Sequence, residues 1–153
     1  MPRKNDPLSR AQHRKIAGDL FNYVWSLLDK KDRGLEEDDE MLHAAHASRF
    51  HWGHAGTPLN LSVGEWQVSR VYATLGRAEP ALYHARRALE IARRSGLGRF
   101  YLGYAYEALA RGAAVAGERR TRDRYLRQAR VIGGGVRDRD DRRMLLEDLA
   151  TIP

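Results

Sequence analysis

The chain is predicted to fold as an all-α protein of about seven antiparallel helices stacked side by side. Apolar residues recur at helical spacing in successive segments of the 153 residues, and clusters of glycine or proline separate these segments. No segment alternates apolar and polar residues well enough to indicate a strand. A chain of this length is expected to form a single domain. The absence of cysteine excludes disulfides, thiolate metal sites and cysteine nucleophiles.

The first two helices follow a short N-terminal arm. Residues 1–10 contain two prolines and mixed charges, so we expect a flexible arm before a helical domain of residues 11–153. Apolar side chains recur at helical spacing in residues 11–30, and the turn signal Asp32-Arg33-Gly34 ends this helix. The second helix is expected at about residues 36–53, because the carboxylates crowded at its start suit the helix dipole.

Capping residues and glycines define the later helices. The third helix, at about residues 59–75, has Thr57 as its candidate N-cap, Pro58 at its first position and Gly76 as its stop. The four remaining helices are expected at about residues 79–95, 99–116, 119–132 and 139–151. We expect the run of glycines at residues 133–135 to break the sixth helix.

Small residues follow the turn glycine Gly76 at regular intervals. Ala81, Ala85 and Ala88 lie five, nine and twelve positions later, as in a tetratricopeptide hairpin. The next hairpin keeps part of this spacing at Gly117, Leu126 and Ala129. Residues 60–132 therefore resemble a degenerate tetratricopeptide-repeat protein, which implies a short α-solenoid with a concave binding groove. The whole chain also resembles a small, uncharacterised bacterial protein family with the run His-Ala-Ala-His-Ala-Ser-Arg at residues 43–49, which implies the fold but no activity.

A binding module is the function that this pattern favours over an enzyme. A peptide or small ligand would lie in a groove formed by the second to fifth helices. Trp66 and Arg70 share one face of the third helix, and an indole N–H can orient a ligand. The candidate contact residues are Glu65, Trp66, Arg70, Tyr72 and His84. The alternative is that Trp66 packs against a neighbouring helix and that His84 is a half-buried, hydrogen-bonded histidine.

Histidines and carboxylates gather on one face of the second helix. Asp39, His43 and His46 are spaced by about one helical turn, and a divalent transition metal favours imidazole and carboxylate ligands. With Glu65 or His84 as a further ligand, such a site would suit a metal-dependent hydrolase or isomerase. The alternative is that these histidines face solvent or form hydrogen bonds at a helix interface. His13 is expected on the surface.

The net charge of +7 raises the possibility of nucleic-acid binding. Arg120, Arg124 and Arg127 on the sixth helix are the candidate phosphate contacts, although an ordinary solvated surface explains them too. No apolar run approaches the roughly 20 residues of a membrane span, and no secretory signal is evident, so a cytoplasmic location is expected. The exposed apolar ends of a short solenoid also suggest a homodimer.

Overall fold

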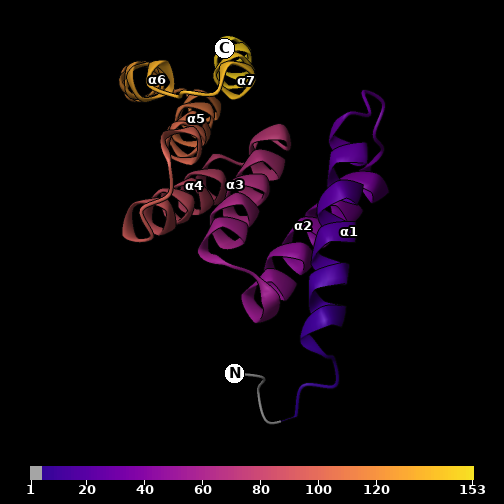
Figure 1. The fold of residues 1–153 in the computed structure, drawn as a ribbon. Coiled ribbons are helices and arrows are strands. Elements are labelled where there is room, and N and C mark those ends of the chain that lie inside the picture. Colours follow the sequence, from indigo (N-terminus) through magenta and orange to yellow (C-terminus); the bar gives the residue numbers. More distant parts are fainter. Residues whose placement is uncertain (1–4) are drawn as a thin grey trace.

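Seven helices and no strand make up residues 5–153, the part of the chain that the computed structural model describes. The predicted all-α stack of antiparallel helices is therefore confirmed (Figure 1). Residues 1–4 of the expected arm lie outside the described residues. The helices are α1 (Arg10–Leu28), α2 (Leu35–Ala55), α3 (Pro58–Thr74), α4 (Ala78–Arg94), α5 (Arg99–Val115), α6 (Arg119–Gly134) and α7 (Arg139–Ala150).

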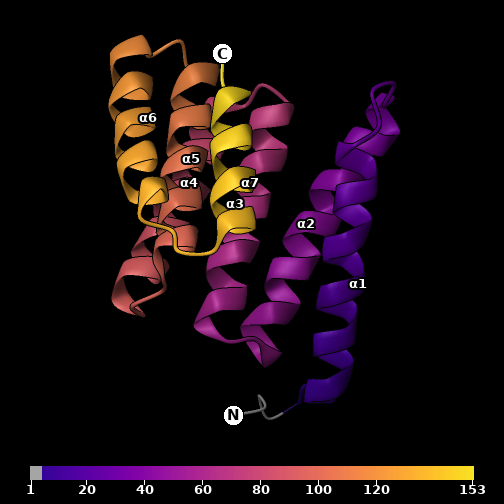
Figure 2. The same ribbon diagram turned by 45° about the horizontal axis from the view of Figure 1, so that its top comes forward.

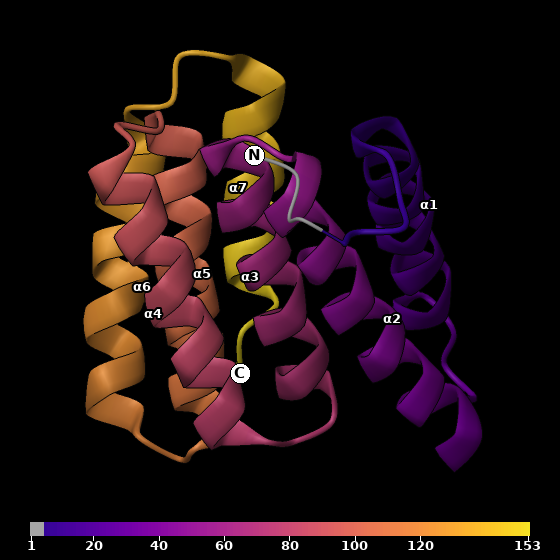
Figure 3. The ribbon, with the colours of Figure 1, turned by 90° about the horizontal axis from the view of Figure 1, so that it is seen from below.

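The helices pack as successive antiparallel hairpins. The hairpins α1–α2, α3–α4 and α5–α6 follow one another from one side of the molecule to the other, and α7 packs on α5 and α6 (Figure 2). The first helix of each hairpin also contacts the first helix of the next hairpin: α1 contacts α3, and α3 contacts α5. Figure 3 shows the same order from below. The odd-numbered helices therefore line one continuous face of the stack.

The predicted helix boundaries agree with the structure to within two residues. Thr57 caps α3 by accepting a hydrogen bond from the Asn60 N–H, and Pro58 occupies the first position of the helix. Gly76 ends the α3 segment with a φ of +71°, a conformation that favours glycine. The run of glycines at residues 133–135 ends the sixth helix as predicted, because α6 stops at Gly134 and Gly135 is its C-cap. A Cβ at Gly133 would lie 2.9 Å from the Leu145 side chain, so this glycine permits close approach of α7.

Small residues bring α4 close to α3, as the sequence predicts. Ala81, Ala85 and Ala88 have no exposed surface. The Ser69 hydroxyl donates to the Ala81 carbonyl at 2.7 Å, and the Ser62 hydroxyl donates to the Ala88 carbonyl at 2.9 Å. Two side chains of α3 therefore bond directly to the backbone of α4.

None of the helices in residues 5–153 combines the length and apolar character needed to cross a membrane.

Candidate functional site

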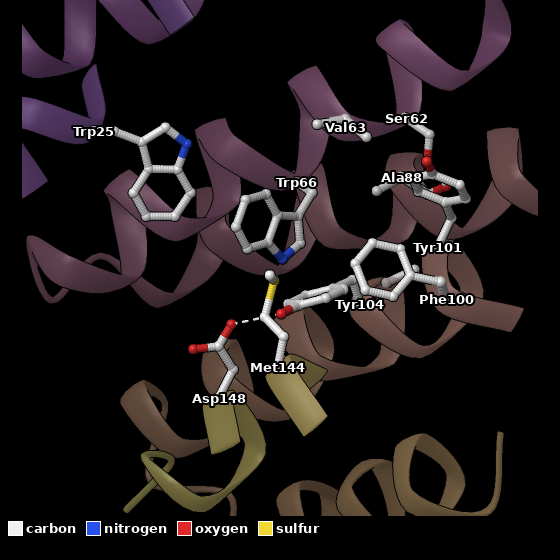
Figure 4. A pocket seen from close by; sticks show the side chains of 11 residues that line it. Trp25, Ser62, Val63, Trp66, Ala88, Phe100, Tyr101, Tyr104, Met144 and Asp148 are labelled. Atoms are coloured by element: carbon white, nitrogen blue, oxygen red, sulfur yellow. Dashed lines mark hydrogen bonds between the residues drawn. The ribbon is translucent and has the colours of Figure 1, made fainter. Parts of the chain in front are cut away.

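A pocket opens on the face of the stack that the odd-numbered helices line (Figure 4). It has a volume of about 210 Å³, and its walls are almost entirely apolar. Helices α1, α3, α4, α5 and α7 all contribute side chains to it. The lining residues are Trp25, Ser62, Val63, Trp66, Ala88, Phe100, Tyr101, Tyr104, Ala105, Met144 and Asp148. Residues from distant parts of the sequence thus form one aromatic cavity.

Trp66 is held in one orientation in the wall of this pocket. Its indole N–H donates to Glu107 Oε2 at 2.9 Å. Its ring lies 5.6 Å from that of Trp25 and meets Tyr104 edge-on at 5.3 Å, an arrangement that aromatic pairs favour. The hydrogen bond and the two ring contacts fix the indole, so the shape of the pocket is preformed.

Glu107 is the most deeply buried charged residue of this region, with 0% of its surface exposed. Its Oε1 accepts hydrogen bonds from Arg70 at 3.1 Å and from Arg111 at 2.7 Å, while Oε2 accepts from Trp66. Burial lowers the pKa of the Arg70 guanidinium, and the Glu107 charge opposes this shift. Buried charges persist only when they are paired and hydrogen-bonded. This network of charged side chains lies beneath Trp66 and fixes the orientation of its indole.

Tyr104 and Asp148 form the polar edge of the pocket. The Tyr104 hydroxyl donates to Asp148 Oδ2 at 2.6 Å. Burial raises the pKa of the Tyr104 phenol, and the Asp148 carboxylate raises it further. The phenol therefore stays protonated and remains a hydrogen-bond donor at physiological pH. Asp148 is half-buried and places a carboxylate at the rim of the pocket.

A second polar cluster joins α2, α3 and α4. Glu65 is buried, and its carboxylate lies 2.9 Å from Arg49 Nε and 2.6 Å from His84 Nδ1. Burial acts to raise the pKa of Glu65, but the bonds to His84 and the Arg49 charge outweigh it and lower the pKa. Tyr72 lies parallel to the His84 ring, and its hydroxyl is 2.9 Å from His46 Nε2. Burial lowers the pKa of His46, and the nearby His84 lowers it further.

The five candidate contact residues therefore fall into two groups. Trp66 lines the pocket. Arg70 does not line it, but donates a hydrogen bond to Glu107, which also holds Trp66. Glu65, Tyr72 and His84 belong to the second cluster, and none of them lines the pocket.

The candidate metal ligands of α2 are not gathered into one site. Asp39 and His43 are exposed, and His46 is half-buried against Tyr72. Among residues 5–153, one group of three or more side chains has ligand atoms close enough to hold a metal ion, namely Asp6, His13 and His54. The expectation that His13 is a surface residue was wrong, because only 3% of it is exposed.

The candidate phosphate contacts of α6 are all exposed. Arg120, Arg124 and Arg127 lie on the outer side of the helix. The Arg124 guanidinium stacks over the Tyr125 ring, 5.1 Å from its centroid. Binding to nucleic acid stays a prediction.

Comparison with known proteins found no protein-family model, curated protein or solved structure that matches this chain. The resemblance to tetratricopeptide repeats therefore stays a prediction. The helical stack and its pocket rest on the structure alone.

Sequence reasoning missed Glu107, the residue on which the pocket depends. A signal for it exists, because Glu107 is the only charged residue in the segment 100–110. A helix that is apolar all round is buried, so a lone carboxylate within it must have partners from other helices.

Proposed function

We propose that this protein is a binding module that accepts an apolar side chain of a partner peptide in the pocket lined mainly by α3, α5 and α7. The observation that carries this proposal is the preformed aromatic cavity around Trp66, whose indole is fixed by Glu107. Preorganised aromatic walls favour binding because little conformational freedom is lost when the partner enters. Aromatic residues and methionine are also enriched at protein interfaces.

The size of the pocket supports a peptide side chain over a whole small-molecule ligand. Its volume of about 210 Å³ is below the roughly 300–1,000 Å³ of common small-molecule sites. Stacks of helical hairpins present extended surfaces along which a peptide can lie. Asp148 at the rim supplies a carboxylate that can accept a hydrogen bond from a peptide N–H. The recognised segment is therefore an extended peptide with one large apolar anchor.

Selection from a random peptide library followed by affinity measurement tests this proposal. Selected peptides should share an aromatic or large aliphatic residue. The variant Met144→Trp fills the pocket from α7, where Met144 is exposed, and should weaken binding by about 30-fold or more, as for a lost interface hot spot. The matched control Leu146→Trp adds the same ring to an exposed position of α7 outside the pocket and should leave affinity unchanged. Equal affinities for both variants would refute a role for the pocket.

A further inference from the structure

Three side chains from three separate parts of the chain meet at one end of the first hairpin. Asp6 precedes α1, His13 lies in the first turns of α1, and His54 lies in the last turn of α2. Because α1 and α2 are antiparallel, the start of α1 lies beside the end of α2. The segment before α1 then places Asp6 against both histidines.

A ring nitrogen of each histidine lies within hydrogen-bond distance of the same Asp6 oxygen. Asp6 Oδ2 lies 2.9 Å from His13 Nε2 and 2.9 Å from His54 Nδ1. The two imidazoles are stacked with their centroids 4.3 Å apart and their planes only 4° from parallel. All three ligand atoms lie within 4.8 Å of one another. Asp6 and His13 have side chains exposed by only 10% and 3%, so they are held in place by packing.

We propose that Asp6, His13 and His54 form a binding site for a divalent first-row transition metal, with Zn²⁺ as the reference ion. Two imidazoles and one carboxylate suit such ions, whereas Ca²⁺ and Mg²⁺ favour sites built from oxygen ligands. Ligand atoms at about 2.1 Å from a tetrahedral zinc lie about 3.4 Å from one another. To hold one ion, the two distances of 2.9 Å would therefore open by about half an ångström, and the stacked imidazole rings would turn so that their nitrogen lone pairs converge.

His51 supplies the outer partner that metal-binding histidines commonly have. His51 Nδ1 lies 2.7 Å from His13 Nδ1, the ring nitrogen of His13 that faces away from Asp6. With the metal on His13 Nε2, the N–H of His13 Nδ1 would donate to His51, which fixes the tautomer and orientation of the ligand. His51 is thus a positioning residue and not a fourth ligand.

One side of the site is open to an incoming ion. Asp6, His13, His51 and His54 line a surface pocket together with Phe50 and other residues that precede α1. The Phe50 ring packs near His54 at 4.8 Å and is itself exposed. Three protein ligands and an open side leave room for water as a further ligand.

Isothermal titration of ZnCl₂ into the untagged, chelator-treated full chain tests the site. We expect saturable binding of a single ion, which Asp6→Asn and His54→Ala remove. His51→Ala should weaken affinity by about 10–100-fold, the usual effect of losing an outer partner. The matched control is His43→Ala, which removes an exposed histidine of the same helix and should leave binding unchanged.

Three results would overturn this proposal. They are the absence of saturable binding, binding that survives both Asp6→Asn and His54→Ala, and binding that His43→Ala abolishes. The last result would instead favour the site predicted at Asp39, His43 and His46. Far-UV circular dichroism of each variant separates lost binding from lost folding. Nitrogen-15 NMR of the imidazoles adds a test in the unmodified protein, because Zn²⁺ should shift His13 Nε2 and His54 Nδ1 and leave His43 unmoved.

Discussion

Replacement of Glu107 by alanine is the most severe single change that the structure allows us to predict. The substitution would leave Arg70 and Arg111, whose side chains are 19% and 14% exposed, without their shared carboxylate. It would also leave the Trp66 N–H without its acceptor. Removal of one partner from a buried ion pair costs about 3–5 kcal/mol, because the other charge stays buried and uncompensated. Native domains are stable by only about 5–15 kcal/mol, so this variant should lose a large part of its folding free energy.

Urea unfolding followed by far-UV circular dichroism measures this loss. Glu107→Gln keeps the size of the side chain and one acceptor oxygen, so it should fall between the wild type and Glu107→Ala. The matched control is Glu90→Ala, which removes a carboxylate that pairs with Arg87 and Arg94 on the surface of α4. Surface pairs of this kind contribute about 0–1 kcal/mol. If Glu107→Ala destabilises the protein no more than Glu90→Ala does, the buried network is not what holds α3 against α5.

Three further predictions concern stability and assembly. Acidification should destabilise the protein, because the folded-state pKa values of His46 and Glu65 are lowered from 6.5 and 4.5, so that the unfolded chain binds more protons. The free energy of unfolding should begin to fall as the pH drops below 6.5 and should fall further below 4.5. A midpoint of urea unfolding that rises on acidification would contradict this prediction. Gly76→Ala should lower the free energy of unfolding by about 1 kcal/mol, because Gly76 has a φ of +71°. Gly18→Ala within α1 has free space for the Cβ and should raise the free energy of unfolding by about 0.5–1 kcal/mol. Equal effects of the two substitutions in thermal unfolding would show that backbone conformation does not determine them. The homodimer expected from the apolar ends of a short stack should double the mass in light scattering, and a monomer at high concentration would exclude it.

The helices could be predicted because their signals are local. Periodicity of apolar residues and the glycines between segments depend only on neighbours in the sequence. Gly133 also has a tertiary role that these local signals do not contain, since it lies within α6 and admits the Leu145 side chain of α7.

The chemistry of the sites could be predicted only in part. The sequence indicates the types of residue that form the sites, because imidazoles, carboxylates and tryptophan do gather in clusters. Their long-range partners were not predictable, since Glu107 bonds to Trp66 and Asp6 bonds to His54, each more than 40 residues away in the sequence. The composition of residues 1–10 suggests a flexible arm, and nothing in it indicates that Asp6 bonds to two histidines.

The residues of α3 explain why one expected site became two. Successive helical residues are rotated by about 100°, so Glu65 and Trp66 reach different neighbours. Glu65 faces Arg49 and His84, while Trp66 and Arg70 share a face and both bond to Glu107. Double-mutant cycles in urea unfolding should therefore give a coupling of about 0.5–3 kcal/mol between Trp66→Phe and Glu107→Gln. Trp66→Phe and His84→Gln share no partner and should be additive within about 0.5 kcal/mol. Strong coupling between Trp66→Phe and His84→Gln would mean that the pocket and the second polar cluster around Glu65 act as one site.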